Sequence, residues 1–160
     1  MKARRNTIPV NVGSVTIGGD APISVQTMST INPVYTVEAI ADVNRLASYG
    51  AELIRFVPDM AAAKALRHVV SASSVPLIAD IHFDYQLALA AVDSGVQGLR
   101  INPGNIGSDD NVYAVVDKVR PRGIPIRIGI NSGSLPQDIL EQYDGHPTAE
   151  GMVEGALRHI

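Results

Sequence analysis

Gln26-Thr27-Met28-Ser29-Thr30-Ile31-Asn32-Pro33 forms the first turn from a predicted strand into a predicted helix. The turn contains neither G-x-G-x-x-G nor G-x-x-x-x-G-K-[ST], the glycine-rich signatures of loops that bind nucleotide phosphates. A doubly wound sheet that binds a dinucleotide carries such a loop at this position. The turn therefore favours the other architecture in which parallel strands alternate with helices, the (β/α) barrel.

The rest of the chain repeats the same strand-then-helix unit. Apolar runs predict strands at residues 23–27, 53–57, 77–81, 99–101 and 126–130, which begin 22 to 30 residues apart. Helical patterns predict helices at residues 36–49, 61–71, 85–94, 110–120 and 149–160, with Thr36 as the N-cap of the first. A small hairpin is expected at residues 10–17, with Gly13 in its turn. We therefore predict an α/β fold, a partial TIM (β/α) barrel of about five units preceded by a hairpin.

Composition excludes several classes of protein. The formal net charge of −3 and the lack of a basic stripe argue against nucleic-acid binding. Hydrophobic residues make up 46% of the chain and aromatic residues only 4%, as expected for buried parallel strands of Val, Ile, Leu and Ala. No apolar run approaches the ~20 residues of a membrane span, so we expect a cytoplasmic protein with no membrane partner. Without cysteine, these residues hold no disulfide and no thiolate-bound zinc or iron–sulfur cluster.

Three predicted strands carry an arginine near the C-terminal end: Arg55, Arg100 and Arg127. A guanidinium is costly to bury alone and binds carboxylate or phosphate oxygens in a forked geometry. Equivalent positions on a repeated unit therefore indicate one shared anionic ligand. The alternative is a set of structural ion pairs, Arg55 with Asp59 and Arg127 with Asp80 or Asp84.

Asp80-Ile81-His82 places two titratable side chains on one face of a strand, because the strand period is two. The pair suits acid–base chemistry or hydrogen bonding to a substrate hydroxyl, and the alternative is a histidine oriented by its aspartate for structural reasons alone. No third ligand of the right type accompanies them, so we predict no metal site. Met28, Asn102 and Asn131 also follow strands and are expected at the C-terminal rim of the barrel.

Four longer motifs at these strand ends closely resemble the N-terminal barrel of the 4-hydroxy-3-methylbut-2-enyl diphosphate synthase family, from about residue 5 to residue 160. They are residues 17–28 (IGGDAPISVQTM), 79–84 (ADIHFD), 99–107 (LRINPGNIG) and 125–135 (PIRIGINSGSL). The resemblance implies an oxidoreductase of the non-mevalonate isoprenoid pathway. Such an enzyme opens 2-C-methyl-D-erythritol 2,4-cyclodiphosphate by two-electron reduction and loss of water, giving 4-hydroxy-3-methylbut-2-enyl diphosphate. It also implies a [4Fe-4S] cluster on a C-terminal domain, a flavodoxin- or ferredoxin-type electron donor and a homodimer.

Roles for individual residues also follow from the resemblance. It implies a diphosphate-binding set formed by Arg55, Arg100, Arg127 and Asn131, catalytic positions at Asp80 and His82, and a pocket lined by Met28 and Asn102. Two departures stand out, Thr27 in place of the more usual serine and the unusual loop at residues 31–35. The loop could change how the first strand end meets the substrate.

We expect residues 1–160 to be the N-terminal part of a substrate-binding TIM barrel, with the remaining strands and the cluster domain outside this chain. On its own, such a piece is predicted to be inactive. Two other hypotheses stay open at this point. One is a barrel enzyme of the dihydropteroate synthase type, and the other is a non-catalytic anion-binding module.

Overall fold

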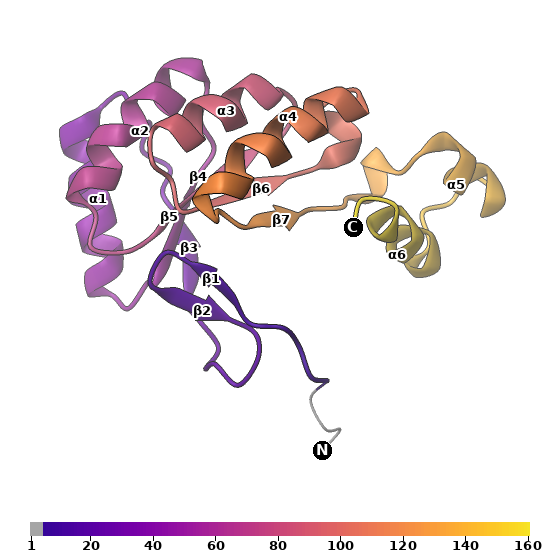
Figure 1. The fold of residues 1–160 in the computed structure, drawn as a ribbon, viewed down its shortest axis with the longest axis horizontal. Coiled ribbons are helices and arrows are strands. Elements are labelled where there is room, and N and C mark those ends of the chain that lie inside the picture. Colours follow the sequence, from indigo (N-terminus) through magenta and orange to yellow (C-terminus); the bar gives the residue numbers. More distant parts are fainter. Residues whose placement is uncertain (1–4) are drawn as a thin grey trace.

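The computed structural model describes residues 5–160 and contains two separate sheets (Figure 1). A two-stranded antiparallel hairpin, β1 (Val10–Val12) and β2 (Val15–Ile17), turns at Gly13, where φ is +55°. A five-stranded parallel sheet follows. Its strands lie side by side in chain order: β3 (Gln26–Met28), β4 (Leu53–Phe56), β5 (Leu77–Ile81), β6 (Gly98–Ile101) and β7 (Ile126–Ile128).

Four helices connect these strands and lie together along one side of the sheet (Figure 1). They are α1 (Thr36–Ser48), α2 (Met60–Ala72), α3 (Tyr85–Asp93) and α4 (Asp109–Val119). A doubly wound sheet reverses its strand order and carries helices on both faces. Sequential strands with all four helices on one face are instead the arrangement of a (β/α) barrel. The predicted fold class is confirmed: five parallel strands alternate with helices, and a hairpin precedes them.

One long-range contact shows that the sheet is strongly curved. β3 and β7 are its two edge strands, and four strand spacings would separate them by about 19 Å in a flat sheet. Nevertheless Arg127 Nη1 on β7 lies 3.4 Å from Gln26 Oε1 on β3. Two side chains cannot close that flat-sheet distance, so the sheet curls around an interior, as a barrel requires.

The two faces of the sheet pack against different partners. Ile54, Ala79 and Ile101 point outward into the main core with the helices, including Leu66 of α2 and Val115 of α4. The alternate side chains face the interior because successive residues of a strand point to opposite faces. On that inner face Leu53 and Ile78 form a second, smaller cluster with Val12 and Val15 of the hairpin. The hairpin therefore covers the inner face near the strand N-termini.

Most predicted boundaries agree with the structure to within two residues, but two local predictions are wrong. The first strand of the parallel sheet begins at Gln26, not at residue 23: Ile23 is 82% exposed, and pairing starts where Glu52 and Leu53 donate backbone N–H groups to the Val25 carbonyl. Thr36 is not an N-cap. Its hydroxyl donates to the Pro33 carbonyl 3.2 Å away, and Thr36 is already the first residue of α1.

After β7 the chain forms two helices set apart from the helical layer, α5 (Gln137–Gln142) and α6 (Ala149–Leu157) (Figure 1). The sequence did not predict α5, which has only six residues and buries only Ile139. Arg158 joins the pair by contacting Asp138 of α5 at 2.5 Å and Glu154 of α6 at 2.8 Å. The hydrogen bond from Arg158 lowers the pKa of Asp138. Within residues 5–160, every helix is too short or too polar to cross a membrane.

Candidate functional site

The inner face of the sheet changes character along each strand. Near the strand N-termini it carries Leu53, Ile78 and Gly98, which we call the apolar layer. Two residues further along the strands, the same face carries charged residues. We call these the charged layer: Arg55, Asp80, Arg100 and Arg127. The register of the sheet aligns Asp80, Arg100 and Arg127 directly across neighbouring strands.

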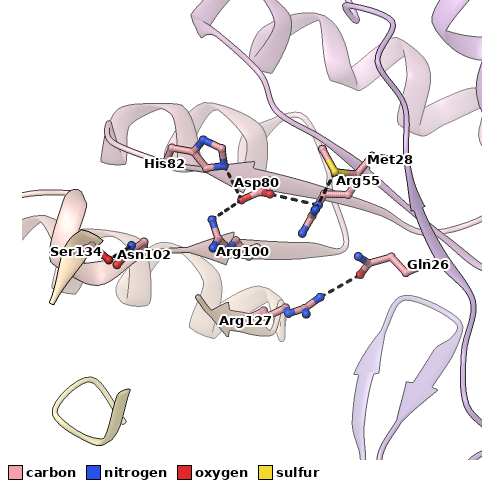
Figure 2. Close-up of polar contacts among 9 residues, drawn as sticks. All are labelled: Gln26, Met28, Arg55, Asp80, His82, Arg100, Asn102, Arg127 and Ser134. Atoms are coloured by element: carbon pink, nitrogen blue, oxygen red, sulfur yellow. Dashed lines mark hydrogen bonds and ion pairs between the residues drawn. The ribbon is translucent and has the colours of Figure 1, made fainter. Parts of the chain in front are cut away.

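Asp80 is the centre of the charged layer (Figure 2). Its carboxylate is buried and meets two guanidinium groups, with Oδ2 at 3.2 Å from Arg55 Nε and Oδ1 at 3.1 Å from Arg100 Nη1. The contact with Arg100 is a hydrogen bond, whereas the contact with Arg55 is close enough for an ion pair but lacks hydrogen-bond geometry. Asp80 thus fixes two arginines from strands on either side of its own.

His82 follows β5 and lies on the same side as Asp80, as the strand period predicted. Its Nε2 is 3.3 Å from Asp80 Oδ1, and 43% of its side chain is exposed. The rings of His82 and Phe83 lie perpendicular to each other with centroids 6.1 Å apart, and Phe83 is 72% exposed. His82 therefore has one ring nitrogen turned to the buried carboxylate while the ring remains open to the mouth of the sheet.

Arg127 is also on the inner face, but its contact differs from those of the other two arginines. Figure 2 shows it directed toward Gln26 and away from Asp80. The three arginines therefore occupy one face, with Arg55 and Arg100 joined through Asp80 and Arg127 beside them. Whether all three reach one anion stays a prediction.

The local ion pairs considered as an alternative do not form. Asp59 is the N-cap of α2, where its carboxylate accepts a hydrogen bond from the Ala62 N–H at 2.8 Å. Asp84 caps α3 in the same way through the Gln86 N–H. Both carboxylates bind the free N–H groups of helix first turns, and neither forms an ion pair with Arg55 or Arg127.

Asn102, Ser134 and Asn131 form a short hydrogen-bonded chain beyond the end of β6. Asn102 is 1% exposed, and its Nδ2 donates to Ser134 Oγ at 2.7 Å. The Ser134 hydroxyl donates in turn to the Asn131 carbonyl at 3.1 Å. Because the serine proton is used there, Ser134 can only accept from Asn102, which fixes the orientation of the amide. The buried Asn102 Oδ1 is left without a hydrogen-bond partner in residues 5–160.

Met28 and Asn131 complete the set of predicted residues. The thioether of Met28, on β3, lies 2.8 Å from Arg55 Nη2 and accepts its hydrogen bond. Asn131 is exposed, and its backbone joins the Ser134 network while its side chain makes no hydrogen bond within residues 5–160. The structure thus places Met28 against the charged layer and Asn131 at its margin.

Two residues with contacts here, Gln26 and Ser134, were expected at the strand ends from the sequence but were given no role of their own. Gln26 shares the inner face with Met28 by the period of two, so the pattern along β3 was the available signal. Ser134 belongs to a 3₁₀ turn (Ser132–Ser134) whose contact with Asn102 joins residues 32 positions apart. No local pattern indicates such a contact.

The charged layer favours anions. The layer holds three guanidinium groups and one carboxylate, which leaves an excess of positive charge in a chain whose net charge is −3. Several N–H groups, on Arg55 Nη1, Arg100 Nη2 and Arg127 Nη2, have no hydrogen-bond partner within residues 5–160. Donors that are held in place but unused can bind phosphate oxygens at little reorganisation cost.

The same residues do not resemble a metal site. Within residues 5–160, no group of three or more His, Cys, Asp or Glu side chains is arranged to hold a metal ion. Asp80 is instead engaged by two arginines and a histidine.

Comparison with known proteins places the chain in a family. The GcpE TIM-barrel domain family matches residues 7–160. The 4-hydroxy-3-methylbut-2-en-1-yl diphosphate synthase (flavodoxin) of Pseudomonas syringae pv. tomato is 52% identical over 158 residues, covering 98% of this chain and 42% of the relative. The protein of the same name from Magnetococcus marinus is 54% identical with the same coverage. The chain thus spans less than half the length of these relatives. The family resemblance identified from the strand-end motifs is confirmed, and the dihydropteroate synthase hypothesis is not favoured.

Proposed function

This chain belongs to the GcpE TIM-barrel domain family, and we propose that it forms the diphosphate-binding part of a 4-hydroxy-3-methylbut-2-enyl diphosphate synthase. The substrate would be 2-C-methyl-D-erythritol 2,4-cyclodiphosphate. Its ring is opened by uptake of two electrons and two protons with loss of one water. The observation that carries the proposal is the pair of arginines, Arg55 and Arg100, held by Asp80 on the inner face at the strand ends.

Arg55, Arg100 and Arg127 would bind the diphosphate. Each has an N–H group without a hydrogen-bond partner in the described chain, and they come from three strands of one curved sheet. A cyclic diphosphate presents several anionic oxygens within a few ångströms, which suits donors from several directions. The negative charge of Asp80 offsets the repulsion between the guanidinium groups of Arg55 and Arg100 when no substrate is bound. Asn131 would add a contact at the margin of the site.

His82 and Asp80 would face the hydroxyl-bearing carbons of the substrate. His82 Nε2 lies 3.3 Å from Asp80 Oδ1 without a hydrogen bond between them, and when Nε2 carries the proton, Nδ1 is an acceptor available to a substrate hydroxyl. This arrangement orients the imidazole and lets it take or return a proton at Nδ1. The buried Oδ1 of Asn102 is a further acceptor for a hydroxyl group, and Met28 would line the pocket beside Arg55.

The electrons would come from outside these residues. A [4Fe-4S] cluster supplies one-electron steps and takes thiolate ligands, and the 160 residues contain no cysteine to provide one. The names of the relatives specify flavodoxin, and we propose a flavodoxin-type donor for the full-length protein. The family resemblance implies that this protein would act as a homodimer.

Calorimetry on the full-length protein tests the diphosphate site. Arg100→Ala should weaken binding of the cyclic diphosphate by about 1.5–3 kcal/mol, the range for a hydrogen bond to a charged group. Arg122→Ala is the matched control, because this arginine pairs with Asp93 on the helical surface away from the charged layer. Equal affinities for the two variants would remove Arg100 from the site.

Turnover tests the histidine. In the full-length enzyme with reduced flavodoxin, His82→Ala should lower kcat by at least about 100-fold with an unchanged melting temperature, as expected for loss of a proton-transfer group. The control is His68→Ala, an exposed histidine on α2. Normal turnover together with a lower melting temperature would instead establish a structural role for His82.

A further inference from the structure

Gly129 lies where a side chain would collide with Arg100. It follows β7 on the inner face, two residues beyond Arg127. A Cβ atom built on Gly129 would overlap the Nε, Nη2 and Cζ atoms of the Arg100 guanidinium. The guanidinium of Arg100 therefore occupies the space that any other residue at position 129 would fill.

The backbone itself does not require glycine at this position. Gly129 is not among the residues with positive φ, and its N–H donates to the Ile101 carbonyl at 2.8 Å, which continues the pairing of β6 and β7. Glycine weakens a strand and is found in strands where another group approaches the backbone closely. The close approach of Arg100 is the physical reason that the structure offers for glycine here.

Arg100 has no easy alternative position. On the other side of its guanidinium, Nη1 is bound to Asp80 Oδ1 at 3.1 Å, and beyond Asp80 lies the positive charge of Arg55. A methyl group on residue 129 would push the guanidinium either toward that like charge or out of the layer, which would break the contact with Asp80. Gly129 and Asp80 thus hold Arg100 from opposite sides.

We infer that Gly129 is a positioning residue, which gives the Arg100 guanidinium the room to stay in the charged layer, where it can meet a bound diphosphate. The inference rests on the proposed diphosphate site for its functional consequence, whereas the packing of Arg100 against Gly129 can be tested without a ligand. A larger residue at position 129 should weaken anion binding only by displacing Arg100, so it should have no further effect on affinity once Arg100 is removed.

The packing is tested by a double-mutant cycle on the full-length protein. Gly129→Ala should lower the melting temperature by roughly 3 °C or more, because overpacking costs about 1–3 kcal/mol. In the Arg100→Ala background the same change should have little effect or raise the melting temperature, since the space is free and alanine restricts the unfolded chain more than glycine. Gly133→Ala is the control, because a Cβ there meets no atom within 4 Å.

The functional consequence is tested with inorganic pyrophosphate and with the cyclic diphosphate by calorimetry. Gly129→Ala should weaken binding of both about as much as Arg100→Ala, roughly tenfold or more, and the double variant should lose no more than Arg100→Ala alone. Gly133→Ala should bind like the parent. Losses that add in the double variant, or an unchanged affinity of Gly129→Ala, would overturn the positioning role.

The two tests separate the inference from the proposed function. If the parent protein binds neither probe, the diphosphate site is wrong, but the thermal cycle still decides whether Gly129 makes room for Arg100. If Gly129→Ala fails to fold and the double variant folds, the packing is supported. Equal thermal losses in both backgrounds, or failure of both to fold, would overturn it.

Discussion

The apolar layer and the charged layer lie on the same face of the same strands, two residues apart along each strand. The apolar layer packs against the hairpin, whereas the charged layer is built from arginines around one carboxylate. In the apolar layer, the hairpin covers Leu53 and Ile78. Val12 of the hairpin also packs against Gly98, because a Cβ on Gly98 would lie 3.1 Å from Val12 Cγ1. In the charged layer, Asp80 is buried by its own partners, and Arg127 remains exposed. A shift of two residues, about 6–7 Å along a strand, thus separates residues that stabilise the fold from residues that can bind a ligand.

The largest expected effect is on stability and comes from the apolar layer. Leu53 is 1% exposed, and Leu53→Ala should lower the free energy of unfolding by about 3–4 kcal/mol through lost burial and a cavity. The folded variant should bind the cyclic diphosphate as the parent does, because the charged layer is unchanged. Urea unfolding and calorimetry measure the two quantities. A loss of affinity as large as the loss of stability would show that the layers are not independent.

Asp80→Ala should lower both the free energy of unfolding and the affinity for the cyclic diphosphate, because Asp80 holds the charged layer together. Without its carboxylate, the half-buried Arg55 and Arg100 are left facing each other, and we expect a loss of about 2–3 kcal/mol of unfolding free energy. The control is Asp93→Ala, which removes a carboxylate from an exposed pair with Lys118 and should cost no more than about 1 kcal/mol. Similar losses for the two variants in urea unfolding would mean that Asp80 is no more than a surface ion pair.

The alternation of the two faces could be predicted from the sequence. The period of two placed Asp80 with His82, and the spacing of apolar runs predicted each of the five parallel strands. The fold class followed from local patterns of this kind, because a parallel strand buried on both faces has few residue types to choose from.

Contacts between distant strands could not be predicted in the same way. The alternative pairing of Arg55 with Asp59, four residues away, does not form, and Arg55 lies instead beside Asp80 on the next strand, whereas Asp59 caps the start of α2. The pairing of Arg127 with Gln26 depends on how far the sheet curls, and the room for Arg100 depends on a missing side chain at Gly129. Curvature and close packing are properties of the assembled sheet, which a single strand does not encode.

Met28→Leu tests a weaker contact of the charged layer. Leucine keeps the volume of Met28 but removes the sulfur that accepts from Arg55 Nη2, so Arg55 becomes less well positioned. We expect roughly two- to threefold weaker binding of the cyclic diphosphate by calorimetry, with the unfolding free energy changed by less than about 0.5 kcal/mol. Met152→Leu, on α6, is the control. Identical affinities for the two variants would show that the thioether does not position Arg55.

The smallest expected effect lies at the rim of the charged layer, where Ser29 links the end of β3 to α1. The Ser29 hydroxyl donates to Asp42 Oδ2 at 2.6 Å, and the Ser29 N–H donates to the Arg55 carbonyl at 3.1 Å. Burial alone would raise the pKa of Asp42, but the hydrogen bonds from Ser29 and Arg45 and the charge of Arg45 together hold that pKa below its ordinary value of 3.8.

Because the folded pKa of Asp42 lies below the unfolded value of 3.8, the carboxylate stabilises the fold above that pH, and this contribution is lost as the pH falls through the folded pKa. Ser29→Ala removes one cause of the shift, so the difference in unfolding free energy between parent and variant should be present at pH 6 and shrink as the pH drops below 3.8. Urea unfolding across that range measures it. Ser48→Ala, which loses a hydroxyl bonded only to the Arg45 carbonyl, should show no such pH dependence. A difference for Ser29→Ala that stays constant with pH would mean that its hydroxyl stabilises the rim without regard to the charge of Asp42.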